Sequence, residues 1–111
     1  MGIKEEIYGD VLVERIIYDR ATLMEAEQLK EQLAIHIASG YRKIVIDLSE
    51  CEFIDSTFLG VIVNSLKKVA KVQGDLKLVG FKPAVKAMFE LTRMFRVFES
   101  FSNIDDAINS F

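Results

Sequence analysis

The sequence predicts a single α/β domain with a mixed, mostly parallel central sheet of four to five strands and about four helices. Three observations lead to this fold class. Short runs of β-branched residues alternate with stretches of helical periodicity, two β-rich segments follow each other at the start, and the composition is that of a globular protein. Half of the 111 residues are apolar, which is enough for one core without metals or disulfides.

The first third of the chain is expected to form a β-hairpin and an amphipathic helix. Residues 3–8 and 11–18 are β-rich, and the turn-like Gly9 lies between them. Over residues 21–39 apolar positions recur every three or four residues, and Gly40 is suited to end that helix. The predicted inward positions are Leu23, Ala26, Leu29, Leu33 and Ile37.

A buried strand and a second helix follow. Residues 43–48 form a short apolar run of the kind found in the middle of a parallel sheet. After residues 55–56, a spacing of about 100° per residue predicts a helix that ends near Gly74. Its predicted inward face consists of Phe58, Leu59, Ile62, Val63, Leu66, Val69 and Ala70, and its outward face carries Asn64, Lys67 and Lys71.

The last third of the chain completes the domain, which we expect to span residues 3–111. Residues 76–80 have the pattern of a strand, and residues 83–91 that of a helix with proline in its first position. Residues 96–98 are predicted to form a short edge strand, and Asn103 to cap a final helix. The inward residues of that helix are expected to be Ile104, Ala107, Ile108 and Phe111.

Composition and charge exclude several classes of protein. A net charge of −3 and an isoelectric point near 5.2 argue against direct binding of nucleic acid. No apolar stretch approaches the roughly eighteen residues that a membrane span needs. The single Cys51 fits a reducing compartment, and the first residues lack the apolar run of a secretory signal, so we expect a cytoplasmic protein.

The sequence offers no recognisable metal, cofactor or catalytic site. His36 and Cys51 lie fifteen residues apart without further ligands, so we expect no metal and interpret His36 as a residue on the flank of a helix. The glycines never cluster into a phosphate-binding loop, and we expect no cofactor. A small hydrolase acting through Ser56 would need a base and a Gly-x-Ser-x-Gly elbow, which are missing, so we expect no enzyme.

The segment around Asp55, Ser56 and Thr57 stands out as a strand-to-helix corner. Strands separated by helices pair in parallel through right-handed crossovers, which places this corner on the carboxyl rim of the sheet, where ligands and partners bind. A phosphate on Ser56 would meet the free N–H groups of the helix start and would make the corner strongly acidic beside Asp55. From the spacing alone, simple helix capping by the same residue types is the favoured explanation.

Several motifs give the chain a resemblance to a known family. These are residues 44–49 (Ile-Val-Ile-Asp-Leu-Ser), 53–60 (Phe-Ile-Asp-Ser-Thr-Phe-Leu-Gly), 78–80 (Leu-Val-Gly) and 83–85 (Pro-Ala-Val). The chain resembles a STAS domain, and more closely the bacterial anti-sigma factor antagonists. The likeness runs from about Lys43 to the end and is most specific at the Asp-Ser-Thr corner.

The resemblance implies a partner-switching function. It implies that Ser56 is phosphorylated by an anti-sigma factor that is itself a serine kinase, and that a PP2C-type phosphatase reverses the modification. The unmodified protein would bind the anti-sigma factor and release a sigma factor for transcription. The family's acidic residue at the end of the second strand matches Asp19, and Asp55 and Thr57 flank the phosphorylated serine. The oligomeric state stays open.

Two positions depart from the family pattern. The corner of the family reads Asp-Ser-Ser/Thr-Gly-Leu-Gly, whereas this chain has Phe58 in place of the first glycine. That ring either meets the partner or turns into the core, and the helical period favours the core. The strand before Asp19 reads Ile16-Ile17-Tyr18 instead of Gly-Glu-Leu. These differences motivate an alternative function, a non-phosphorylated accessory STAS subunit of a transporter or signalling assembly.

Overall fold

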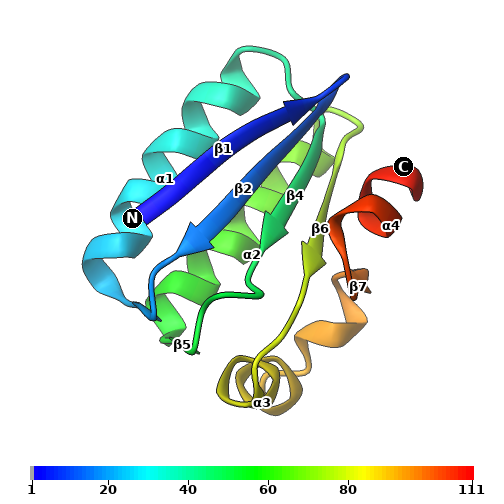
Figure 1. The fold of residues 1–111 in the computed structure, drawn as a ribbon. Coiled ribbons are helices and arrows are strands. Elements are labelled where there is room, and N and C mark those ends of the chain that lie inside the picture. Colours follow the sequence, from blue (N-terminus) through cyan, green and yellow to red (C-terminus); the bar gives the residue numbers. More distant parts are fainter. Residues whose placement is uncertain (1) are drawn as a thin grey trace.

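The computed structural model describes residues 2–111 and has a five-stranded mixed sheet at its centre (Figure 1). Its strands are β1 (Gly2–Tyr8), β2 (Val11–Ile17), β4 (Lys43–Asp47), β6 (Asp75–Val79) and β7 (Ser100–Phe101), in the order β1-β2-β4-β6-β7. Only the β1–β2 hairpin is antiparallel, and the other neighbours pair in parallel. The predicted fold class is therefore confirmed.

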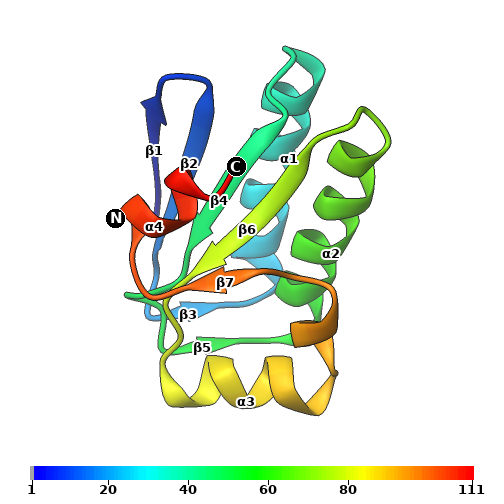
Figure 2. The same cartoon turned by 90° about the vertical axis from the view of Figure 1, so that its right-hand side faces the viewer.

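Four α-helices cover the sheet (Figures 1 and 2). They are α1 (Leu23–Ala38), α2 (Ser56–Ala70), α3 (Pro83–Leu91) and α4 (Ile104–Asn109). Helices α1 and α2 lie side by side on one face, α4 lies on the other, and α3 sits beyond the end toward which β4 and β6 point. A second, two-stranded sheet of β3 (Arg20–Ala21) and β5 (Phe53–Ile54) lies near α3.

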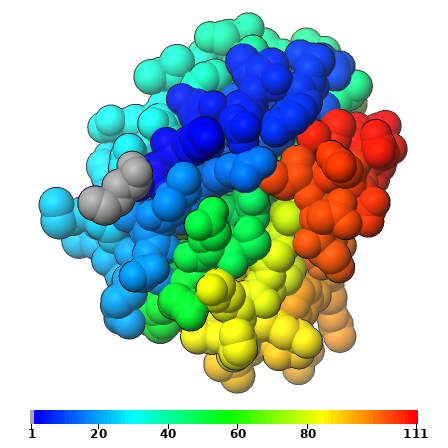
Figure 3. Space-filling model, in the orientation of Figure 1, coloured from blue at the N-terminus to red at the C-terminus, as the bar shows by residue number. Residues whose placement is uncertain are grey.

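The side chains of a strand alternate between the two faces of the sheet, so there is an apolar cluster on each face. These two clusters hold the helices against the sheet. On the α1 and α2 face, buried residues of β2, β4 and β6 pack against the helices. On the α4 face, Val13, Val45 and Val79 pack against Ala107, as the predicted inward face of the last helix requires. Figure 3 shows the C-terminal residues, in orange and red, beside the N-terminal hairpin in blue.

Lys77 ties α4 to the sheet. This side chain is 4% exposed, and its ammonium donates hydrogen bonds to the Ser110 carbonyl oxygen (3.0 Å) and hydroxyl oxygen (2.8 Å). It also lies 4.5 Å from the centre of the Phe111 ring. The C-terminal end of a helix carries partial negative charge, so a lysine beneath it is favourable. The short C-terminal helix is thereby anchored by a charge as well as by apolar contact.

Three predictions at the level of single elements are wrong. Residues 96–98 do not pair as a strand: Met94–Arg96 form a 3-10 turn, Phe98 packs into the core against Phe89, and the edge strand begins at Ser100. Leu23 is 67% exposed and Ala70 is exposed, although both were predicted to face inward. Both lie at the edge of the apolar stripe and in a terminal turn, where the period alone decides least.

Glu14 is the least expected residue of the core. It is fully buried on β2, between Leu12 and Ile16 on the face toward the helices, and directly opposite Glu5 of β1. Burial raises the pKa of the Glu14 carboxyl to about 9, and the neighbouring Glu5 carboxylate favours the protonated acid further. Glu14 is therefore neutral at pH 7 in the folded protein.

Gly74 marks a close approach of two backbones that a side chain would disrupt. A Cβ added there would lie 2.6 Å from Val69 Cγ2 and closer still to the Arg42 carbonyl oxygen, whereas a Cβ at Gly60 in α2 would meet nothing within 4 Å. We expect Gly74→Ala to lower the free energy of unfolding by about 1–3 kcal/mol. The matched change Gly60→Ala should raise it by about 0.5–1 kcal/mol. Urea unfolding checks both, and equal effects of the same sign would contradict this packing.

Glu14 also predicts how stability depends on pH. In the unfolded chain a glutamate titrates at about 4.3, so between that value and about 9 only the folded state keeps the proton. Stability is therefore greatest below the unfolded pKa and falls as pH rises, by at most about 1.4 kcal/mol per pH unit. The isosteric Glu14→Gln should match the native protein near pH 4 and exceed it increasingly above that. Urea unfolding with a chelator present measures the difference, and parallel pH profiles would refute it.

Candidate functional site at the Asp-Ser-Thr corner

The corner lies where β5 ends and α2 begins, at the end of the sheet toward which the parallel strands point (Figure 1). Asp55 is the N-cap of α2 in an extended conformation, and its Oδ1 accepts a hydrogen bond from the Phe58 N–H at 2.8 Å. Its carbonyl oxygen accepts the first helical bond, from the Leu59 N–H at 3.1 Å. Capping is thus the task of Asp55 alone.

Ser56 and Thr57 are the first two residues of α2, and both are exposed. Their backbone N–H groups belong to the first turn of a helix, which has no internal acceptors. An anion at this position meets those N–H groups and the positive end of the helix dipole. The structure therefore presents the Ser56 hydroxyl at the surface, beside donors suited to a phosphate.

The β3–β5 pair fixes the corner to the end of the hairpin. Arg20 pairs with Phe53, and the Asp55 N–H donates to the Ala21 carbonyl oxygen at 3.2 Å. The Asp19 carbonyl oxygen accepts hydrogen bonds from the N–H groups of residues 52 (2.8 Å) and 53 (3.0 Å). Asp19 itself is exposed, so the structure brings the acidic residue predicted from the second strand to the segment that leads into Asp55.

Two charged contacts at this rim were not predicted from the sequence. The Arg20 guanidinium lies 4.3 Å from the centre of the Phe53 ring, and the Lys82 ammonium lies 3.4 Å from a Glu52 carboxylate oxygen. A strand of two residues is too short to show an alternating apolar and polar pattern, so the sequence does not predict that residues 20 and 53 pair. Together with Asp19 and Asp55 they give the rim charges of both signs.

Phe58 is fully buried in the main core. Its proposed role as a direct partner contact beside Ser56 is therefore wrong for this conformation, and the core position favoured by the helical period is confirmed. The ring fills the volume beneath the first turn of α2, where the family pattern has a glycine. The corner therefore exposes Ser56 and Thr57, while the Phe58 ring packs beneath them in the core.

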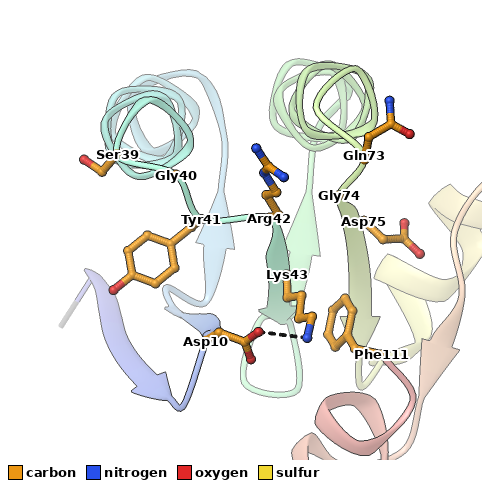
Figure 4. A pocket seen from close by; sticks show the side chains of 10 residues that line it. All are labelled: Asp10, Ser39, Gly40, Tyr41, Arg42, Lys43, Gln73, Gly74, Asp75 and Phe111. Atoms are coloured by element: carbon orange, nitrogen blue, oxygen red, sulfur yellow. Dashed lines mark ion pairs between the residues drawn. The ribbon is translucent and has the colours of Figure 1, made fainter.

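Two hollows lie near or opposite this corner. A groove of about 560 Å³ between α1 and α2 starts at Thr57 and is lined by Lys30, Lys67, Lys68 and Lys71, among others. A second cavity of about 600 Å³ lies at the opposite end of the sheet, where β4 and β6 begin (Figure 4). There Lys43 pairs with Asp10 at 2.8 Å, and the Phe111 ring lies beside them. This cavity shares no residue with the corner.

The sequence model of the STAS domain family matches residues 20–107. This chain is a STAS domain. The match runs from β3 into α4 and includes the whole corner, whereas the outer bounds 3–111 stay a prediction. Within residues 2–111, no helix is long and apolar enough to cross a membrane.

Several relatives of this STAS domain are named anti-sigma factor antagonists. The anti-sigma-B factor antagonist of Listeria monocytogenes is 31% identical over 84 residues, 76% of this chain and 73% of the relative. BtrV of Bordetella bronchiseptica, provisionally named an anti-sigma factor antagonist, is 37% identical over 73 residues, 66% of this chain. The aligned part spans 63% of BtrV, slightly less than two thirds. The crystal structure of TM1081 from Thermotoga maritima matches with a TM-score of 0.88 and 29% identity, covering 97% of this chain and 92% of that one.

The Asp55 cap predicts a specific order of stabilities. Asp55→Ala removes the acceptor for the Phe58 N–H and should lower the free energy of unfolding by about 1 kcal/mol. Asp55→Asn keeps a side-chain oxygen in the same place and should cost markedly less. Ser56→Ala changes an exposed side chain and should stay within about 0.5 kcal/mol of the native protein. Chemical unfolding of the three variants tests this order, and equal losses for Asp55→Ala and Asp55→Asn would contradict it.

Proposed function

We propose that this STAS domain is an anti-sigma factor antagonist switched by phosphorylation of Ser56. In its unphosphorylated form it binds an anti-sigma factor that is itself a serine kinase, and a sigma factor is released. Phosphorylation of Ser56 by that kinase ends the interaction, and a PP2C-type phosphatase restores it. In this scheme the chain is a substrate and a ligand and performs no chemistry of its own.

The proposal rests on the different roles of Asp55 and Ser56 at the corner. Asp55 caps α2, so the hydroxyl of Ser56 is free of that task and exposed. The names of the relatives support the anti-sigma factor antagonist function, and the Asp-Ser-Thr pattern supports the choice of Ser56. A kinase needs an accessible hydroxyl, and Ser56 offers one at the first position of a capped helix.

The electrostatics of the rim supply a mechanism for the switch. A phosphoserine carries roughly −1.5 to −2 charges at pH 7, and Asp55 and Asp19 already stand at this end of the molecule. The helix start tolerates the added charge, so the domain keeps its fold. A partner surface complementary to the unmodified rim would meet strong repulsion or an unpaired buried charge, either of which weakens binding. We therefore assign Asp19, Asp55 and Thr57 to the partner surface around Ser56.

The alternative function, a non-phosphorylated accessory subunit, was motivated by Phe58 and by the altered second strand, and the structure removes the first of these two reasons. Phe58 was the larger departure from the family pattern, and its burial leaves the outer surface of the corner unchanged. The altered second strand remains, but it too ends beside the corner through the Asp19 carbonyl oxygen. The phosphorylation switch is therefore the better supported function.

Phosphorylation of Ser56 is tested directly with the anti-sigma kinase encoded by the same organism. After incubation with that kinase and ATP, peptide mass spectrometry should find phosphate on Ser56. Ser56→Ala should abolish the modification, and Thr57→Ala should leave it in place. Phosphate on Thr57 alone, or on neither residue with an active kinase, would refute the assignment.

The switch itself is tested by binding. Ser56→Asp should weaken anti-sigma binding by about tenfold or more, which corresponds to about 1.4 kcal/mol, while Ser56→Ala keeps the native affinity. Asn109→Asp adds the same charge on α4, on the other face of the sheet, and serves as the matched control. Isothermal titration calorimetry measures all three. Equal affinities for Ser56→Asp and Asn109→Asp would contradict a local electrostatic switch.

A further inference from the structure

Three potential metal ligands meet between the N-terminal hairpin and α1. They are Glu5 of β1, Glu14 of β2 and His36 of α1, and one ligand atom of each lies within 4.8 Å of the others. Glu5 and Glu14 are directly opposite in the hairpin, so their side chains share a face. The His36 Nδ1 lies 3.0 Å from a Glu5 carboxylate oxygen. Three separate elements thus converge on one point.

The buried member of this cluster accepts no hydrogen bond. Glu14 is 0% exposed, and neither of its side-chain oxygens accepts a hydrogen bond within residues 2–111, although the protonated acid can donate one to Glu5. The side-chain oxygen of Gln32, one turn before His36 on α1, is also buried without a partner. A buried polar group without a partner is costly, and such groups are rare unless an ion or water completes them.

No lysine or arginine of the described residues pairs with the acidic side chains of this cluster. Within the described residues, the only ion-pair partner of Glu5 is His36, and Glu14 has none. Two nearby cations are engaged elsewhere: Arg15 of the hairpin pairs with Glu6, and Lys43 of β4 pairs with Asp10. Two carboxylates and one imidazole therefore face each other without a lysine or arginine.

We propose that Glu5, Glu14 and His36 form a binding site for a divalent transition-metal ion of the zinc class. Two carboxylate oxygens and one imidazole nitrogen form a donor set that suits Zn²⁺ and Co²⁺, and a water molecule completes four-coordination. Zinc holds such atoms at about 2.0–2.2 Å, which requires the three groups to move slightly closer together. Glu5 lies on the edge strand β1 and is free to make that adjustment.

The bound ion would fasten the hairpin to α1. Strand β1 is held to the sheet on one side only, and the metal would add a link from it to the helix layer. The His36 ring is already oriented, since it stacks edge-on against Tyr41 with ring centres 5.7 Å apart. Because a metal binds its ligands in their deprotonated forms, binding should strengthen as pH rises.

The test uses the full chain freed of metal with a chelator. His36 is the only histidine, so its imidazole signals in a proton NMR spectrum report on this site without ambiguity. We expect one equivalent of Zn²⁺ to shift those signals and to give a single binding event in calorimetry. Co²⁺ should give the visible absorption of a low-coordinate site, and Zn²⁺ should raise the unfolding temperature.

Matched variants separate this site from adventitious binding. Glu14→Gln and His36→Gln should each weaken Zn²⁺ binding by about tenfold or more. Glu50→Gln removes an exposed carboxylate elsewhere, and Cys51→Ser removes the one thiol, so both should bind like the native protein. Unshifted His36 signals at saturating Zn²⁺, or native Zn²⁺ affinity in a folded Glu14→Gln variant, would overturn the proposal. The Glu14 carboxyl would then bind only a proton.

Discussion

The parallel pairing of β2, β4 and β6 is the constraint on which the rest of this domain depends. These strands are buried on both faces, so each face needs its own cover: α1 and α2 on one side, and α4 on the other. Parallel neighbours also require long crossovers, which bring the loops after β4 and β6 and the start of α2 to one end of the sheet. The position of the corner with Ser56 therefore results from the parallel sheet. The corner is exposed because it lies at the end of that sheet.

Hydrogen bonds between the end of the hairpin and the segment before α2 then fix the position of the corner. The carbonyl oxygens of Asp19 and Ala21 accept three N–H groups from residues 52, 53 and 55, which docks the segment before α2 onto the end of the hairpin. The Asp55 carboxylate caps the helix, and Phe58 fills the core beneath it. A serine held in this way has a fixed position before any partner arrives. In the proposed switch, phosphorylation would change the charge of this surface, and no rearrangement of the fold would be needed to change affinity.

The corner and the middle of β2 place their charged groups in different surroundings. At the corner, charged groups lie at the surface, where water screens them and where they are accessible to another molecule. At Glu14 a carboxyl lies within the apolar layer between β2 and α1, where its ionisation is costly unless a cation compensates. Leu12 and Ile16 on either side show that an apolar residue would suit the core at this position. The proposed metal ion would compensate the charge of an acid at this position, opposite Glu5 and near His36.

Periodicity and capping residues by themselves determined the order of elements, the parallel centre, the β-hairpin and the position of Asp55-Ser56-Thr57 at a helix start. These features depend on local spacing, which the chain carries in its sequence. Only the tertiary structure decided the rest. Phe98 enters the aromatic cluster with Phe89, which moves the edge strand to Ser100, and the two-residue strands β3 and β5 exist because the ends of β2 and β4 bring them together. The cluster of Glu5, Glu14 and His36 likewise joins residues up to 31 positions apart, since 36 − 5 = 31. Such contacts arise from how layers stack, and no local pattern in one sequence records which distant side chains will face each other.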